Sequence, residues 1–76
     1  MPHVEMKCYP GRTEEQKKAC AEKIAQCIAE TMGCGISHVS VSIEEVPQND
    51  WKEQVWDVEI SPKMDALYIK PGYTCE

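Results

Sequence analysis

The sequence has few basic residues and no cluster of them. Its 76 residues include eight Lys and Arg against thirteen Asp and Glu, which gives a net charge of −5. The lysines between positions 14 and 23 are interspersed with glutamates, a pattern typical of a solvated helix face. Because a phosphate backbone binds clustered cations, this distribution argues against nucleic acid as a partner.

Long apolar runs are also missing. No stretch approaches the roughly 18 apolar residues of a membrane span, and the start, Met1 to Glu5, lacks the basic and apolar regions of a signal peptide. We therefore expect a cytoplasmic protein with no membrane partner. A chain this short forms one domain, residues 2–76, and buries a modest fraction of its apolar surface, so we expect assembly to stabilise it.

Closely spaced cysteine pairs are absent as well. The chain has five cysteines, an odd number that fits reduced thiols better than a disulfide framework. Cys20, Cys27 and Cys34 recur every seven residues and could align along a helix as soft metal ligands. Structural zinc sites, however, usually bring pairs two to four residues apart. We expect buried, inert cysteines and no metal.

Two alternating segments flank one helical segment. From Pro2 to Tyr9 and from Val39 to Ile43, apolar and polar residues alternate as in half-buried strands. Between them, Thr13 and Gln16 form a capping box, and apolar residues then recur three or four apart until Gly33 and Gly35. The apolar stripe consists of Cys20, Ile24, Cys27, Ile28 and Met32.

The expected fold class is α/β (α+β). With a long helix between them, the two strands would lie parallel and be joined by a right-handed crossover. Because one helix covers one sheet face, we expect the other face to pack against a second copy, so that oligomerisation completes the sheet. Two short C-terminal helices should follow, one capped by Asp50 and running through Glu53, the other from Ser61-Pro62 to Pro71.

Pro2 becomes the amino terminus when Met1 is removed, a step favoured before a small second residue. The resulting secondary amine would lie on the same strand face as Val4 and Met6. An apolar environment disfavours the charged form, which would lower the pKa of the amine towards neutrality and make it a useful base. The alternative is that Pro2 merely begins an edge strand, a position that proline tolerates.

Residues 2 to 52 resemble the 4-oxalocrotonate tautomerase family without a gap. The resemblance is carried by Pro2, by the run from Pro10 to Lys17 (PGRTEEQK), by the run from Val39 to Glu45 (VSVSIEE) and by Trp51. The resemblance implies an enzyme, with no cofactor or metal, in which Pro2 shuttles a proton of an enol.

The same resemblance implies substrate-binding roles for four further residues. Arg12 would hold a carboxylate, as a planar cation close to a helix start can, although a surface ion pair with a glutamate is an alternative. Trp51 would form an apolar wall, in competition with Trp56, and Tyr9 would add a hydrogen bond.

The fourth residue, Ser40, is a departure from the family. It stands where the family has a second arginine, and a serine offers only a neutral hydrogen bond. We therefore expect a monocarboxylic 2-oxo acid in its enol form, such as phenylenolpyruvate, rather than a dicarboxylate. His3 and His38 fall among polar residues, and we expect them to be solvated and without partners.

The tail from Trp56 to Tyr73 is the second departure, because it is longer than in hexameric members and resembles a bacterial subgroup that forms dimers. We therefore expect a homodimer rather than a hexamer. Two competing functions remain open: a hydratase or decarboxylase of the same superfamily acting on small acids, and a non-catalytic oligomeric interaction module.

Overall fold

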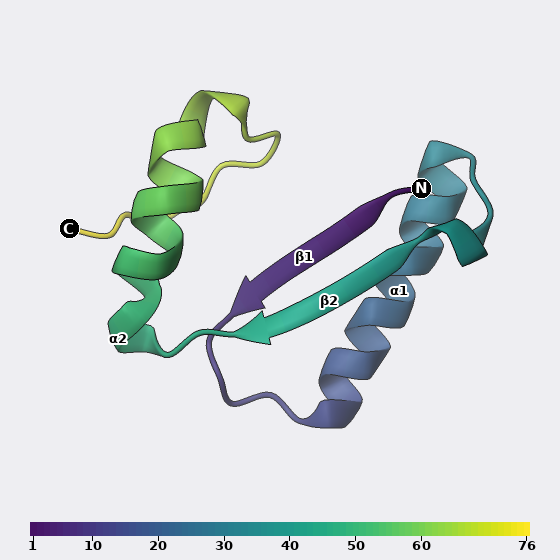
Figure 1. Ribbon diagram of the computed structural model, residues 1–76, viewed down its shortest axis with the longest axis horizontal. Helices are drawn as coiled ribbons and strands as arrows, with labels where there is room; N and C mark the ends of the chain where they lie inside the picture. Colours follow the sequence, from purple (N-terminus) through teal and green to yellow (C-terminus); the bar gives the residue numbers. More distant parts are fainter.

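The computed structural model describes residues 1–76 and begins with the expected strand, helix and strand. Strand β1 is His3–Cys8, helix α1 is Glu14–Met32, a single 3₁₀ turn η1 is Ile36–His38, and strand β2 is Ser40–Glu45 (Figure 1). The two strands are parallel, with His3 opposite Ser40 and Cys8 opposite Glu45. The βαβ unit predicted from the sequence is therefore confirmed.

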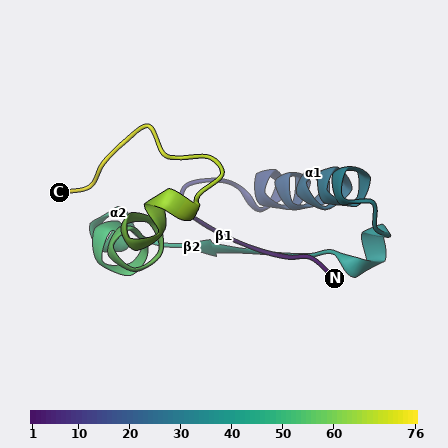
Figure 2. The same cartoon turned by 90° about the horizontal axis from the view of Figure 1, so that it is seen from above.

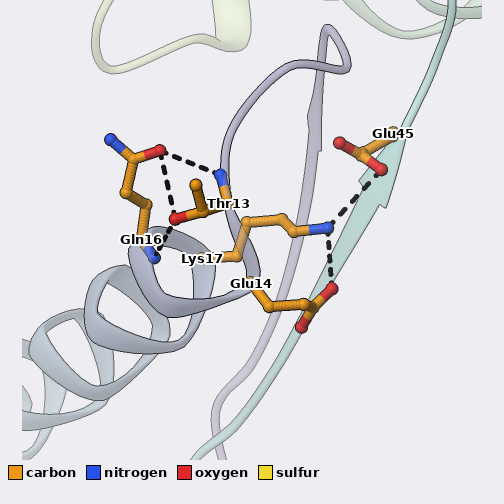
Figure 3. A network of polar contacts seen from close by, with 5 residues as sticks. All are labelled: Thr13, Glu14, Gln16, Lys17 and Glu45. Atoms are coloured by element: carbon orange, nitrogen blue, oxygen red, sulfur yellow. Dashed lines mark hydrogen bonds and ion pairs between the residues drawn. The ribbon is translucent and has the colours of Figure 1, made fainter.

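Helix α1 begins at the predicted capping box (Figure 3). The Gln16 backbone N–H donates to Thr13 Oγ1 (3.1 Å), and the Thr13 N–H donates to Gln16 Oε1 (2.9 Å). Lys17 lies between Glu14 Oε1 (3.0 Å) and Glu45 Oε1 (3.5 Å), which raises the pKa of Lys17, chiefly through the hydrogen bond to Glu14. These contacts tie the start of α1 to the end of β2.

Removing the cap should therefore destabilise the helix start. We expect Thr13→Ala to lower the free energy of unfolding by about 1 kcal/mol, because it leaves a backbone donor of the first turn unsatisfied. Thermal unfolding followed by circular dichroism at one fixed chain concentration measures the effect. Thr13→Ser keeps the hydroxyl and is the matched control. A Thr13→Ala variant as stable as the Ser variant would contradict the capping role.

The two faces of the sheet differ in character. Val4, Met6, Val41 and Ile43 are half-buried on the face covered by α1, whereas Figure 2 shows no element on the opposite face. That uncovered face carries only polar side chains: His3, Glu5, Lys7, Ser40, Ser42 and Glu44. The prediction that a second copy covers this face assumed that the face is apolar. The structure does not support that assumption, because alternation places the apolar strand residues on the face covered by α1.

The predicted apolar stripe of α1 is only partly correct. Ile24 and Ile28 are half-buried, together with small residues turned to the sheet, but Cys20 and Cys27 are exposed and Met32 is 71% exposed. The expectation of buried cysteines at these two positions is therefore wrong for the single chain. An open groove of about 500 Å³ runs along this flank of α1 and is lined in part by Cys20, Ile24 and Cys27.

The C-terminal segment forms one nearly continuous helical run where two short helices were predicted. It consists of α2 (Gln48–Trp51), a π-helical stretch η2 (Lys52–Ile60) and a 3₁₀ segment η3 (Ser61–Ala66). Pro47 occupies the N-cap, and the Asp50 N–H donates to the Pro47 carbonyl (2.9 Å), so the predicted Asp50 cap is wrong.

The fully buried core is small and lies where the C-terminal helices meet the strands. It contains only Val46, Val55 and Trp56. An ion pair between Lys7 Nζ and Glu59 Oε1 (2.8 Å) joins β1 to η2. No helix of the chain combines the length and the apolar composition needed to cross a membrane. Such a small core leaves much of the stability to be supplied by other contacts.

Candidate functional site

An open hollow of about 540 Å³ lies at the C-terminal end of β1. Residues from the end of β1, the loop to α1, helix α2 and the C-terminal tail line it, and five of its eight lining residues are hydrophobic. The hollow thus combines segments from both ends of the sequence. Among its lining residues are three of the predicted site residues, Tyr9, Arg12 and Trp51.

Arg12 is brought to this hollow by the turn that precedes α1. Gly11 has φ +126°, a conformation that side-chain-bearing residues rarely adopt, and this glycine lets the chain turn from β1 to the helix. No carboxylate lies within ion-pair distance of Arg12, so the alternative of a surface ion pair with a glutamate finds no partner. The guanidinium is free to bind an anion, and the nearby helix start favours one.

The second cation of the hollow, Lys7, is already paired. Its ammonium donates to Glu59 Oε1 (2.8 Å), and this hydrogen bond raises the pKa of Lys7 above its ordinary value, partly opposed by desolvation. Lys7 is therefore charged at neutral pH, but a local carboxylate balances its charge. Arg12 is the cation of this hollow that remains for a ligand.

Aromatic rings form the wall beside Arg12. The rings of Tyr9 and Trp51 meet edge to face with centroids 5.0 Å apart, and Trp51 Nε1–H donates to the Tyr73 hydroxyl oxygen (3.2 Å). Trp56 competes with Trp51 for the wall in the sequence, but the structure buries Trp56 to 7% exposure and leaves it out of the lining. Of the two tryptophans, Trp51 is the one at the hollow.

Pro2 and Ser40 lie together at the other end of β1. The Ser40 N–H donates to the Pro2 carbonyl (3.2 Å), and Ser40 Oγ is hydrogen-bonded to His3 Nδ1 (2.6 Å). The expectation that His3 has no partner is therefore wrong, because parallel register sets it opposite Ser40. In Figure 1 this end of β1, marked N, is far from α2. A strand of six residues separates the two ends by about 20 Å.

Within one chain, the structure thus divides the five predicted site residues into two groups. Tyr9, Arg12 and Trp51 share the hollow, whereas Pro2 and Ser40 do not reach it. The sequence reasoning also missed Tyr73, which follows the last helical segment and belongs to no periodic pattern that could have revealed it. No three His, Cys, Asp or Glu side chains converge in a way that could hold a metal ion.

Comparisons with known proteins agree with the fold of the chain. A sequence model described as "Tautomerase enzyme" matches residues 2–55. Tautomerase PptA of Enterobacter sp. (strain 638) is 51% identical over 97% of this chain and 99% of its own. Tautomerase PptA of Escherichia coli O127:H6 is 39% identical over the same shares of the two chains.

Solved structures give the same picture for the βαβ unit. One of the 4-oxalocrotonate tautomerase isozymes from Methylibium petroleiphilum is 40% identical, with a TM-score of 0.63 over 66% of this chain and 81% of that chain. TomN, a 4-oxalocrotonate tautomerase homologue of the tomaymycin biosynthetic pathway, is 28% identical, with a TM-score of 0.64 over 66% of this chain and 77% of that chain. This chain therefore belongs to the tautomerase family, whose members are isomerases of small molecules.

Proposed function

We propose that this enzyme converts the enol of a monocarboxylic 2-oxo acid, such as phenylenolpyruvate, to its keto form, with the nitrogen of Pro2 as general acid and base. The observation that carries the proposal is the unpaired Arg12 beside the Tyr9 and Trp51 rings in a hollow whose lining is mostly hydrophobic. A single free cation suits one carboxylate, and aromatic walls suit an apolar substituent. Ser40, in place of a second cation, gives a dicarboxylate no charged partner for its far end.

The proton transfer needs only the protein's own groups. After loss of Met1, which is 98% exposed, the Pro2 nitrogen has a lone pair. In the proposed step the nitrogen accepts the proton of the enol hydroxyl and delivers a proton to carbon 3, while Arg12 holds the carboxylate and stabilises the charge on the enolate.

Because Pro2 and Arg12 lie at opposite ends of β1, we propose that each active site combines two chains. The carbonyls of Pro2 and Cys8 accept hydrogen bonds from the backbone N–H groups of Ser40 and Val46, so the backbone groups of the even-numbered β1 residues point towards β2. The backbone groups of His3, Glu5 and Lys7 therefore point to a free edge, which can pair with another strand. Antiparallel pairing of two β1 edges is self-complementary and sets the Pro2 end of one chain beside the Arg12 end of the other.

The alternative edge, on β2, would not bring the two ends together as closely. Pairing through β2 would leave the two β1 strands three strand spacings apart, about 14 Å. The exposed groove of α1 also lies on the β1 side. The opposite flank of the helix, with Lys18 and Ala21, lines a hollow together with Val41 and Ile43 of β2, so the flank with the groove is the one nearer to β1. A dimer through β1 would cover the apolar atoms around Cys20 and Cys27. We favour this homodimer over a hexamer because the tail from Trp56 to Tyr73 is longer than in hexameric members and resembles that of a bacterial subgroup that forms dimers.

The proposal predicts ketonisation that depends on Pro2. Purified protein, whose intact mass shows that Met1 is absent, should accelerate the ketonisation of phenylenolpyruvate, followed by ultraviolet absorbance. Pro2→Ala should lower kcat/KM by on the order of 10²-fold or more, the usual contribution of a general acid and base. Equal rates for the two proteins, or no acceleration by either, would refute the proline mechanism.

A further inference from the structure

We propose that Tyr73 in the C-terminal tail is a specificity-determining residue of this site, in which it donates a hydrogen bond to a substrate oxygen and forms a wall for an aromatic substituent. The inference rests on the function proposed above. It is carried by the position of Tyr73, which lines the same hollow as Arg12 although 61 positions separate the two residues in the sequence.

The ring of Tyr73 is held in place by two tryptophans. On one side it lies 5.4 Å from the ring of Trp56, centroid to centroid, and Trp56 is part of the buried core. On the other side its hydroxyl accepts the Trp51 Nε1 proton (3.2 Å). A tail residue would otherwise be mobile, but contacts at both ends of the side chain make Tyr73 a defined part of the hollow.

The hydroxyl of Tyr73 retains an unused donor. A phenol oxygen can accept and donate at once, and the bond from Trp51 uses only its accepting capacity. No acceptor in the chain takes the Tyr73 O–H proton, and the side chain is partly exposed (47%) at the hollow. The O–H can therefore point to a bound ligand. Together with Arg12 it supplies one charged and one neutral donor, which fits an acid with a single carboxylate and a second oxygen.

The wall is assembled from three aromatic rings. Tyr9 packs edge to face on Trp51, and the hydroxyl of Tyr73 accepts the Nε1 proton of the same indole. A flat aromatic substituent can pack against such a surface, whereas a charged far end finds no partner among these rings. The tail thus favours phenylenolpyruvate over 2-hydroxymuconate, whose second carboxylate would face the rings.

Two substitutions at Tyr73 separate the hydrogen bond from the wall. Tyr73→Phe keeps the ring and removes the hydroxyl, so we expect kcat/KM to fall by about three- to tenfold for both phenylenolpyruvate and 2-hydroxymuconate. Tyr73→Ala removes both, and we expect a further loss of about three- to tenfold for phenylenolpyruvate alone. Cinnamate, an unreactive aromatic acid, should lose inhibitory potency in the same order. Tyr68→Phe and Tyr68→Ala are the matched controls, because Tyr68 is fully exposed.

The outcomes distinguish this inference from the function on which it rests. Pro2→Ala should lower kcat/KM by on the order of 10²-fold or more for both substrates. An unchanged kcat/KM in this variant would argue against the proline mechanism rather than against the role of the tail. With Pro2→Ala impaired in this way, a Tyr73→Phe variant with unchanged kinetics, or a Tyr73→Ala variant that slows both substrates equally, would overturn the role of Tyr73. Circular dichroism of each variant at the assay temperature checks that the chain remains folded, so that a shift in selectivity reports on the site.

Discussion

A chain that retains one residue before Pro2 is expected to lose at least about 10³-fold in kcat/KM for phenylenolpyruvate while keeping its fold. An acylated Pro2 nitrogen is an amide, which has no basic lone pair, so the proposed acid and base would be gone. The fold should tolerate the extra residue because Met1 is 98% exposed at this position. Such a chain can be prepared by cleaving a fusion protein so that a glycine precedes Pro2.

The matched control is the same fusion cleaved to leave Pro2 as the first residue. Intact mass distinguishes the two products, and circular dichroism together with light scattering should show the same fold and assembly in both. Comparable activity of the two chains would contradict a catalytic amine at Pro2. This experiment tests the nitrogen itself, since no side chain differs between the chains.

Mixing two inactive variants, Pro2→Ala and Arg12→Ala, is expected to restore activity to about a quarter of the wild-type value. In the proposed dimer each site takes Pro2 from one chain and Arg12 from the other. A mixed dimer therefore has one intact site and one site that lacks both residues. Random exchange places half of the chains in mixed dimers, and half of the sites of each mixed dimer are intact.

The measurement requires that the subunits exchange completely. The two variants are unfolded together in denaturant and refolded at equimolar concentration, and kcat/KM for phenylenolpyruvate is compared with that of each variant refolded alone. Arg12→Ala alone should lose on the order of 10²-fold because the carboxylate loses its charged partner. A mixture no more active than the mean of its components would show that the site lies within one chain, and would contradict pairing through β1.

Local features of the fold were predictable from the sequence because short-range rules determine them. Alternation placed Val4 and Met6 on one strand face, the Thr13 and Gln16 pair marked the helix start, and Gly33 ended the helix in a left-handed conformation. The parallel arrangement of the strands followed from the length of the connecting helix. Residues within a few positions of one another sufficed for each of these predictions.

Predictions that depended on the environment of a side chain succeeded less often. Cys20 and Cys27 were expected to be buried, but small residues of α1 face the sheet and leave these thiols exposed in the single chain. His3 was expected to be free, yet the register of the strands gives it Ser40 as a partner. Such contacts join residues far apart in the sequence, and no local pattern encodes them.

The candidate site shows the same division most clearly. The sequence by itself determined which residues we propose for the chemistry, because Pro2, Arg12 and Trp51 resemble the family in identity and spacing. Only the tertiary structure decided which of them meet: an extended strand, about 20 Å long, separates the Pro2 end of β1 from the end at which Arg12 lies, and the tail brings Tyr73 to Trp51. The physical reason is that the length of a strand and the path of the folded tail set distances in space, whereas the spacing of residues in a sequence gives only distances along the chain.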